Sequence, residues 1–205
     1  MKAKKKVVSL AVVLILLAIA ATGTLAYITD SGTAHNVITT GLIDIELKEQ
    51  MIGEDGESLV DFPQEGIPGV MPGADVSKIV SVVNKSTGDA WIRIKVEQSI
   101  VGADGNKLDD SVITINYTNT TENEQEPWWI LGDDDYWYYS DAVAPGATTK
   151  TLFDSVSFSG EMDNTYQNSK ISVIVSAEAV QVANNPIPES GSVVDIPGWP
   201  AAVTP

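Results

Sequence analysis

Apolar and polar side chains alternate with a period of two through most of the chain beyond residue 42. Ile43, Ile45 and Leu47 alternate with two acidic residues, and residues 91–97 repeat the pattern. Because successive side chains of a β-strand point to opposite faces, the pattern predicts strands with one buried face. Further strands are predicted in residues 76–83, 112–117, 136–140, 149–158 and 171–182. About eight short strands separated by turns indicate an all-β sandwich.

Two kinds of turn separate the predicted strands. Asp-Gly pairs at residues 55–56 and 104–105 lie between apolar residues, and glycine accepts the positive φ of a tight hairpin there. Pro-Gly pairs at residues 72–73 and 145–146 each precede a predicted strand. Proline followed by glycine is typical of a type II turn, so we expect two strands to begin at similar corners.

The carboxyl end differs from the rest of the chain because prolines interrupt it. They stand at positions 186, 188, 197, 200 and 205. Proline cannot donate a main-chain hydrogen bond to a sheet, so these positions break any ladder. We therefore predict one sandwich domain over residues 27–183 and a proline-rich, flexible tail over residues 184–205.

The amino end has the three parts of a secretory leader. Four lysines within the first six residues precede an apolar stretch over residues 7–21, and the small residues Thr24 and Ala26 follow before Tyr27. This order predicts a helical signal peptide over residues 1–26 that is cleaved after Ala26. An uncleaved anchor is the alternative, and in that case the leader is the contact with the membrane.

Composition agrees with export of a single soluble domain. The net charge is −16 and becomes −20 without the four leader lysines. A surface of this sign repels nucleic acid, which binds clustered lysine and arginine, and it favours solubility. The chain contains no cysteine, so an ordinary hydrophobic core must stabilise the domain.

A set of short motifs follows one another in a specific order. They are residues 24–30, 34–36 and 40–45, the first Pro-Gly pair with residues 80–84 and 91–95, and then residues 137–139, 143–146, 152–153, 156–158, 164–167 and 177–181. In this order they resemble the TasA/camelysin family of secreted proteins. The resemblance implies a jelly-roll-like antiparallel β-sandwich, a leader removed by a SipW-type signal peptidase, and a place outside a bacterial cell, in the matrix or at the surface.

The family's best-understood members assemble into biofilm-matrix fibres, and their mature N-terminal segment is thought to add as a strand to the neighbouring subunit. The matching segment here is residues 27–38, in which the candidate donor residues are Tyr27, Ile28, Thr29, Asp30, Val37 and Ile38. Strand addition uses main-chain hydrogen bonds at an open sheet edge. Neighbouring copies or related matrix subunits are the implied partners. The alternative is an ordinary N-terminal strand of the same domain.

Some relatives in this family carry a metalloendopeptidase label. A zinc protease normally needs a clustered set such as His-Glu-x-x-His, whereas this chain has one histidine, His35, and no cysteine. A catalytic serine would need a nucleophile turn, and no Gly-x-Ser-x-Gly motif is present. We therefore expect no enzymatic activity and no cofactor.

Acidic clusters offer oxygen atoms of the kind that calcium binds. The candidate ligands are Asp104 and Asn106 in one cluster and Asp133 and Asp135 in another. Neither cluster matches the spacing of an EF-hand loop, and such runs are more often solvated turns. Calcium binding that rigidifies a loop stays open as a weak hypothesis.

Aromatic residues gather in residues 128–139, which suggests an extracellular module that binds carbohydrate. The candidate contacts are Trp128, Trp129, Trp137 and Tyr139. Exposed rings beside carboxylates stack on sugars, but alternation along a strand sends every second ring into the core. We therefore favour a core role, in which alternate rings enter the core and the others brace the neighbouring strand.

Overall fold

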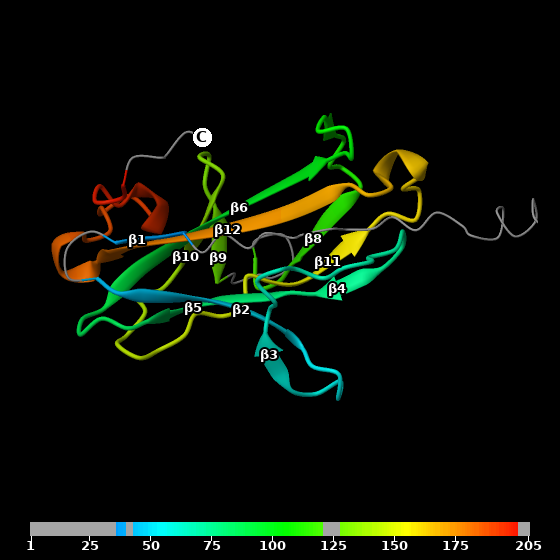
Figure 1. Ribbon diagram of the computed structural model, residues 1–205. Coiled ribbons are helices and arrows are strands. Elements are labelled where there is room, and N and C mark those ends of the chain that lie inside the picture. Colours follow the sequence, from blue (N-terminus) through cyan, green and yellow to red (C-terminus); the bar gives the residue numbers. More distant parts are fainter. Residues whose placement is uncertain (1–35, 40–42, 121–127, 201–205) are drawn as a thin grey trace, which may run out of the picture.

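The computed structural model describes residues 36–39, 43–120 and 128–200 and shows an all-β fold, as the alternation predicts (Figure 1). The strands are β1 (Asn36–Thr39), β2 (Ile45–Ile52), β3 (Leu59–Asp61), β4 (Asp75–Ser77), β5 (Ile79–Asn84), β6 (Ala90–Val101), β7 (Lys107–Leu108), β8 (Ile113–Tyr117), β9 (Trp129–Leu131), β10 (Tyr136–Tyr139), β11 (Phe153–Phe158) and β12 (Lys170–Gln181). Three 3₁₀ turns, η1 (Asn164–Tyr166), η2 (Val182–Asn184) and η3 (Val193–Asp195), are the helical elements of the described residues. The predicted signal peptide lies outside them.

The main sheet has the strand order β1-β12-β6-β10-β9, with β7 added at the end of β6. Strands β6 and β12 pair antiparallel along their whole length, from Ala90 with Gln181 to Val101 with Lys170. Two three-stranded sheets, β3-β2-β5 and β4-β11-β8, lie across the core (Figure 1). Main-chain bonds from Thr149 to Val82 and from Leu152 to Val80 connect them. The result is two layers around one core.

Alternate residues of the long strands fill this core, as the period of two predicts. On β12 the inward residues Ile171, Val173, Val175, Ala177 and Ala179 are all buried. Their neighbours Ser172, Ile174 and Ser176 are half-buried. Full burial of a valine or isoleucine side chain contributes about 1.5–3 kcal/mol, so this strand supplies a large part of the driving force for folding.

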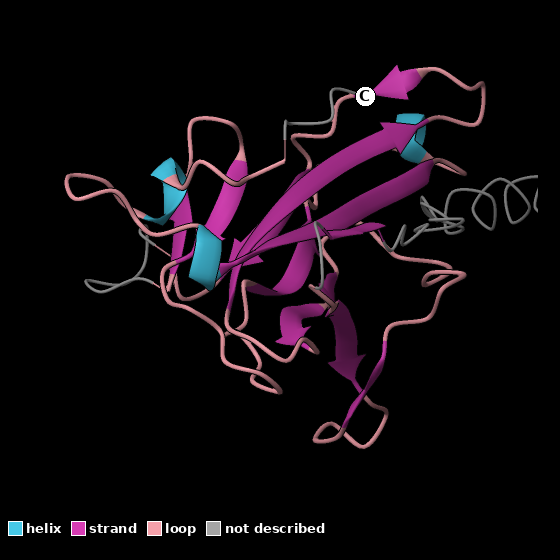
Figure 2. Ribbon diagram, turned by 90° about the vertical axis from the view of Figure 1, so that its left-hand side faces the viewer, coloured by secondary structure: helices cyan, strands magenta, loops and turns pink. Residues whose placement is uncertain are grey.

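Both predicted hairpins form at the Asp-Gly pairs. Gly56 and Gly105 have φ of 75° and 84°. The first turn joins β2 to β3, which projects from the body of the molecule, and the second joins β6 to β7 (Figures 1 and 2). The positive φ explains why glycine stands at both positions.

The two Pro-Gly corners have the same geometry. Gly73 and Gly146 have φ of 77° and 75°. Ala74 N donates to Met71 O over 3.0 Å, and Ala147 N donates to Ala144 O over 3.0 Å. A bond from the fourth residue to the first, with positive φ at the third, is the geometry of a type II turn. The expectation from the sequence is confirmed.

One predicted strand divides into two. The run over residues 76–83 becomes β4 and β5, which belong to different sheets. Lys78 stands at the break, where its side chain is buried and its Nζ lies 2.7 Å from Glu49 Oε1. A buried charge needs a partner of opposite charge, and Glu49 provides it for Lys78.

The sequence predicts a flexible tail over residues 184–205, and the structure corrects this for residues 185–200; residues 201–205 lie outside the described part of the chain. After η2 the chain crosses the outer face of the main sheet, and Val193 and Ile196 become buried there. Prolines exclude this segment from a ladder, but they do not prevent the apolar residues between them from packing. Residues 185–200 therefore form a third layer over one end of the sheet.

Candidate functional site

The N-terminal strand β1 lies at the edge of the main sheet. It runs parallel to β12 with Asn36 opposite Ser176 and Thr39 opposite Ala179 (Figure 1). Strands β1 and β12 pair parallel, whereas the other strand pairs among the described residues are antiparallel. A strand in this position is held by a main-chain ladder on one side only, which makes the β1–β12 edge the candidate assembly site.

The same edge of β12 extends beyond β1. Strand β12 has 12 residues, and β1 pairs with its positions 176–179. No other described strand pairs with positions 171–175 on this side. Main-chain groups along an edge of this kind are available for an added strand.

An apolar cavity of about 30 Å³ lies beneath this part of β12. Its wall includes Ile171 and Val173 of β12, and the other lining residues are Phe62, Ile67, Val70, Val76, Lys78, Val156 and Phe158. Lys78 Nζ lies 4.0 Å from the centre of the Phe62 ring, and burial lowers the pKa of this amine. The cavity has room for a small apolar group between the two layers.

The structure describes only part of the predicted donor segment. Val37 and Ile38 belong to β1 and stand opposite Ala177 and Glu178. The other candidate donor residues, Tyr27, Ile28, Thr29 and Asp30, lie outside the described residues, as do the cleavage residues Thr24 and Ala26 and the histidine His35.

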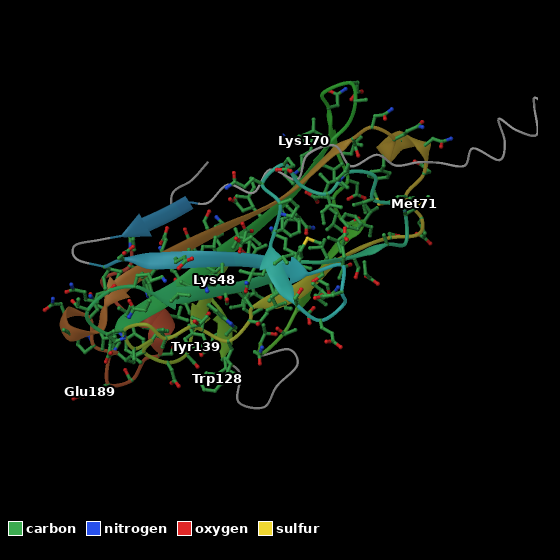
Figure 3. All side chains as sticks on the ribbon, turned by 60° about the horizontal axis from the view of Figure 1, so that its bottom comes forward. Lys48, Met71, Trp128, Tyr139, Lys170 and Glu189 are labelled. Carbon is green, nitrogen blue, oxygen red and sulfur yellow. The ribbon has the colours of Figure 1, made fainter. Side chains whose placement is uncertain are left out.

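The candidate aromatic contacts do not form an exposed platform, which agrees with the favoured core role and argues against a sugar platform at these residues. Trp129, Trp137 and Tyr139 are 0%, 4% and 6% exposed. Trp128 is half-buried and stacks on Tyr139 with ring centres 5.8 Å apart (Figure 3). The reason lies in β10, where Trp137 and Tyr139 enter the main core while the other two tyrosines face the C-terminal segment. This strand is therefore buried on both faces.

A surface groove of about 510 Å³ nevertheless lies beside β10. Tyr117 and Trp137 meet in its wall with ring centres 4.7 Å apart. The other lining residues are Lys95, Val96, Glu97, Gln98, Leu131 and Asp135. A groove with aromatic walls and polar groups of both signs suits a polar organic ligand.

The candidate metal ligands lie in turns, and some of their oxygen atoms accept hydrogen bonds within those turns. The Asp104 carboxylate accepts hydrogen bonds from Asn106 N and Asn106 Nδ2 over 3.0 and 2.8 Å, and these bonds lower the pKa of Asp104. Asp133 and Asp135 are exposed, and Asp135 occupies a positive φ of 64° in the turn before β10. Within the described ranges, no group of three or more His, Cys, Asp or Glu side chains is placed to hold a metal ion.

A buried ionic cluster on the outer face of the main sheet was not predicted from the sequence. Arg93 of β6 and Glu178 of β12 stand directly opposite each other, and both are 2% exposed. Arg93 Nε and Nη2 lie 2.8 and 2.6 Å from Glu178 Oε2. Arg93 Nη1 also donates to Tyr138 Oη over 2.9 Å, and burial raises the pKa of this phenol to about 12.

This cluster holds the C-terminal segment in place. Arg93 Nη2 donates to Pro200 O over 2.7 Å. Tyr136 Oη donates to Glu178 Oε1 over 3.1 Å, so both carboxylate oxygens are satisfied. The sequence feature that could have indicated this cluster is Arg93 itself, because it is the chain's single arginine and occupies an outward position of an alternating strand.

Comparison with known proteins finds no matching family model, no matching curated protein and no matching solved structure. Among the residues that the structure describes, no helix is both long and apolar enough to span a bilayer.

Proposed function

We propose that the chain is a secreted structural protein of a bacterium, a subunit or accessory of extracellular biofilm-matrix fibres, without enzymatic activity of its own. On this proposal a SipW-type signal peptidase releases a jelly-roll-like sandwich that begins at Tyr27. Neighbouring copies or related matrix subunits are then joined by addition of the N-terminal strand. The observation that carries the proposal is the position of β1, parallel to β12 at the edge of the main sheet.

The register of β1 makes residues 27–38 a suitable donor. Asn36 stands opposite Ser176. If the segment continues as a strand, residues 31–35 come opposite positions 171–175 of β12, which no other described strand pairs on that side. In this register, residues 30–38 come opposite residues 170–178 of β12. Main-chain pairing of this kind depends little on the identity of the side chains.

The cavity beneath β12 adds a place for an apolar donor side chain. Its wall includes Ile171 and Val173, which belong to the acceptor stretch. In strand addition, main-chain bonds supply affinity and pockets for alternate side chains supply specificity.

Exchange of β1 between copies leads to a filament. A subunit that donates its N-terminal strand to one neighbour can accept a strand from another at its own β12 edge. A head-to-tail contact of this kind does not close on itself unless its rotation generates a ring. Cleavage of the leader frees the donor end, which ties export to assembly.

Electron microscopy of the chain that begins at Tyr27 tests the proposal. We expect filaments from this chain and separate particles from a variant that lacks residues 27–38. Circular dichroism checks that the deleted variant keeps its β-sheet. An excess of a synthetic peptide of residues 27–38 should shorten the filaments, because it occupies the same edge. Separate particles from the complete mature chain over a range of pH and salt would refute the proposal.

A second candidate function is an extracellular module that binds a polar ligand, and the groove beside β10 favours it. The groove brings Asp135 and Trp137 together with Tyr117. Calorimetric titration with neutral oligosaccharides tests this role, and we expect heat of binding that Glu97→Gln reduces. If the chain forms filaments but binds no oligosaccharide, only the structural role remains.

A further inference from the structure

The outer face of the main sheet carries a second hydrophobic cluster at the end where β12 leaves the sheet. Trp91, Tyr136, Tyr138 and Val180 are 1–7% exposed there, although they point away from the main core. Together with Arg93 and Glu178 we call these residues the Arg93 face. Residues 185–200 cover it, and they form the orange-to-red segment beside the end of β12 in Figure 1.

Side chains of the face hold the covering segment at both of its ends. Trp91 Nε1 donates to Asn185 O over 2.8 Å at one end, and Arg93 Nη2 donates to Pro200 O at the other. The Trp199 ring meets the Tyr138 ring edge to face at 5.4 Å, and its centre lies 5.0 Å from Arg93 Cζ. These contacts resemble those of a peptide bound to a groove, because they join rings and side chains to single carbonyl groups.

The covering segment divides into an exposed linker and a buried anchor. Residues 186–192 are all exposed, and Glu189 lies at the far end of the molecule from Lys170 and Met71 (Figure 3). Residues 193–200 form the anchor, in which Val193 and Ile196 are 2% and 3% exposed. Trp199 Nε1 donates to Val193 O over 3.1 Å, so the anchor keeps its shape through its own bonds.

We propose that the Arg93 face is a docking surface for a short apolar segment folded as residues 193–200 are, and that the C-terminal segment of a second copy can occupy it in place of the chain's own. The exposed linker allows this exchange, because seven extended residues reach about 23–25 Å. An anchor supplied by another copy makes the same contacts as the anchor supplied by the same chain, which is the condition for exchange of identical elements. This contact is separate from the N-terminal strand and goes beyond the proposed function.

A peptide-binding experiment tests the proposal. The chain over residues 27–205 with Ile196→Asp places a charge on the buried anchor position and so opens the face. A fluorescent peptide of residues 186–205 stands in for the C-terminal segment of a second copy. We expect saturable binding, measured by fluorescence anisotropy, that is at least tenfold tighter to the Ile196→Asp chain than to the unsubstituted chain.

Matched peptides separate specific docking from adhesion to exposed apolar surface. A peptide with Trp199→Ala should bind at least tenfold more weakly, because it loses the ring contacts with Tyr138 and Arg93. A peptide with Glu189→Gln should bind as the original does, because this residue lies in the exposed linker.

A second variant keeps the test valid if Ile196→Asp does not fold. Val193 is the other buried residue of the anchor, at 2% exposed, so Val193→Asp also places a charge on a buried anchor position and opens the face. The proposal is overturned if a folded opened chain fails to bind the peptide, or if all peptides bind equally. It is also overturned if the unsubstituted and opened chains bind the peptide with equal affinity. Each of these results is independent of whether filaments form.

Discussion

The two ends of the described chain attach to the same sheet in opposite ways. At the amino end, β1 joins the edge of β12 through a main-chain ladder with four paired positions, Asn36–Thr39 with Ser176–Ala179. At the carboxyl end, residues 185–200 cover the face of the same sheet through rings, apolar side chains and the Arg93 cluster. Figure 1 shows both attachments at the same end of β12.

The difference shows how one sheet can offer two kinds of contact. An edge accepts any extended segment whose main chain is free to pair, so its occupant is easily exchanged and weakly specified by sequence. A face accepts only side chains that match its pockets and charges, so its occupant is strongly specified. The first contact suits repetitive assembly, and the second suits recognition of one particular segment.

The largest effect is expected from Arg93→Ala, which breaks the face attachment at its centre. The substitution leaves Glu178 buried without its cationic partner, so the free energy of unfolding should fall by about 3–5 kcal/mol in urea denaturation. Lys85→Ala is the control, because the Lys85–Glu46 pair is about half exposed and a surface pair of this kind contributes little to stability. Equal losses for the two variants would contradict a central role for the buried pair.

The next effect is expected from Ile196→Ala, which tests whether the anchor is packed rather than loosely attached. Ile196 is 3% exposed, so its truncation should cost about 2–4 kcal/mol. Ile187 belongs to the same segment and is 38% exposed, so Ile187→Ala should change stability by less than about 0.5 kcal/mol. If thermal or urea unfolding finds both changes small, the segment is a flexible tail after all.

Alkaline pH should weaken the Arg93 face in particular. The pKa of Tyr138 is raised from 10.0 to about 12 by burial, so the folded chain keeps a proton that the unfolded chain releases above pH 10. The stabilisation is complete below pH 10 and is lost as the pH rises toward 12. Urea midpoints between pH 8 and 11.5 should fall less steeply for Tyr138→Phe than for the unsubstituted chain. If the urea midpoints of the two chains fall in parallel with pH, the raised pKa of Tyr138 does not stabilise the folded chain.

The smallest effect on stability is expected at β1, where Val37→Pro removes one main-chain donor from the edge ladder. The substitution affects one position of a four-residue edge ladder, so unfolding of the dilute monomer should change by less than about 1 kcal/mol. Filament formation, however, should be lost, because the donor strand can no longer pair. Val37→Thr keeps both the donor and a β-branched side chain, so it should still form filaments. Filaments from the proline variant would show that assembly uses another surface.

Local features of the fold could be predicted from the sequence because they depend on neighbouring residues. The period of two in β12 and the positive φ of Gly56 and Gly105 follow from side-chain alternation and turn chemistry. The pairing of β1 with β12 joins residues about 140 positions apart, and alternation contains no information about partner or direction.

The Arg93 face could not be predicted from the sequence for a related reason. Arg93 and Glu178 read as solvated outward positions until the C-terminal segment covers them. The prolines of that segment suggested a flexible tail, whereas Val193, Ile196 and Trp199 provide an apolar surface that only the folded sheet can bury. Similarly, alternation along β10 predicts that one set of rings enters the core, but it does not predict that the C-terminal segment covers Tyr136 and Tyr138 on the other face.

Pairing between copies at the β1–β12 edge is the central claim, and a disulfide test addresses it most directly. The chain has no cysteine, and Asn36 and Ser176 stand opposite each other in the register. Chains with Asn36→Cys and chains with Ser176→Cys, one of them with a C-terminal tag, are mixed and oxidised after assembly. The control replaces Ser176→Cys with Glu57→Cys, an exposed position in the β2–β3 turn.

We predict a mixed dimer on a non-reducing gel for the Asn36→Cys and Ser176→Cys pair, absent with reductant and at background level in the control mixture. A mixed dimer no more abundant than in that control would contradict assembly by strand addition. If, in addition, the Asn36→Cys/Ser176→Cys double variant closes its disulfide only within one chain, β1 is an ordinary strand of its own domain.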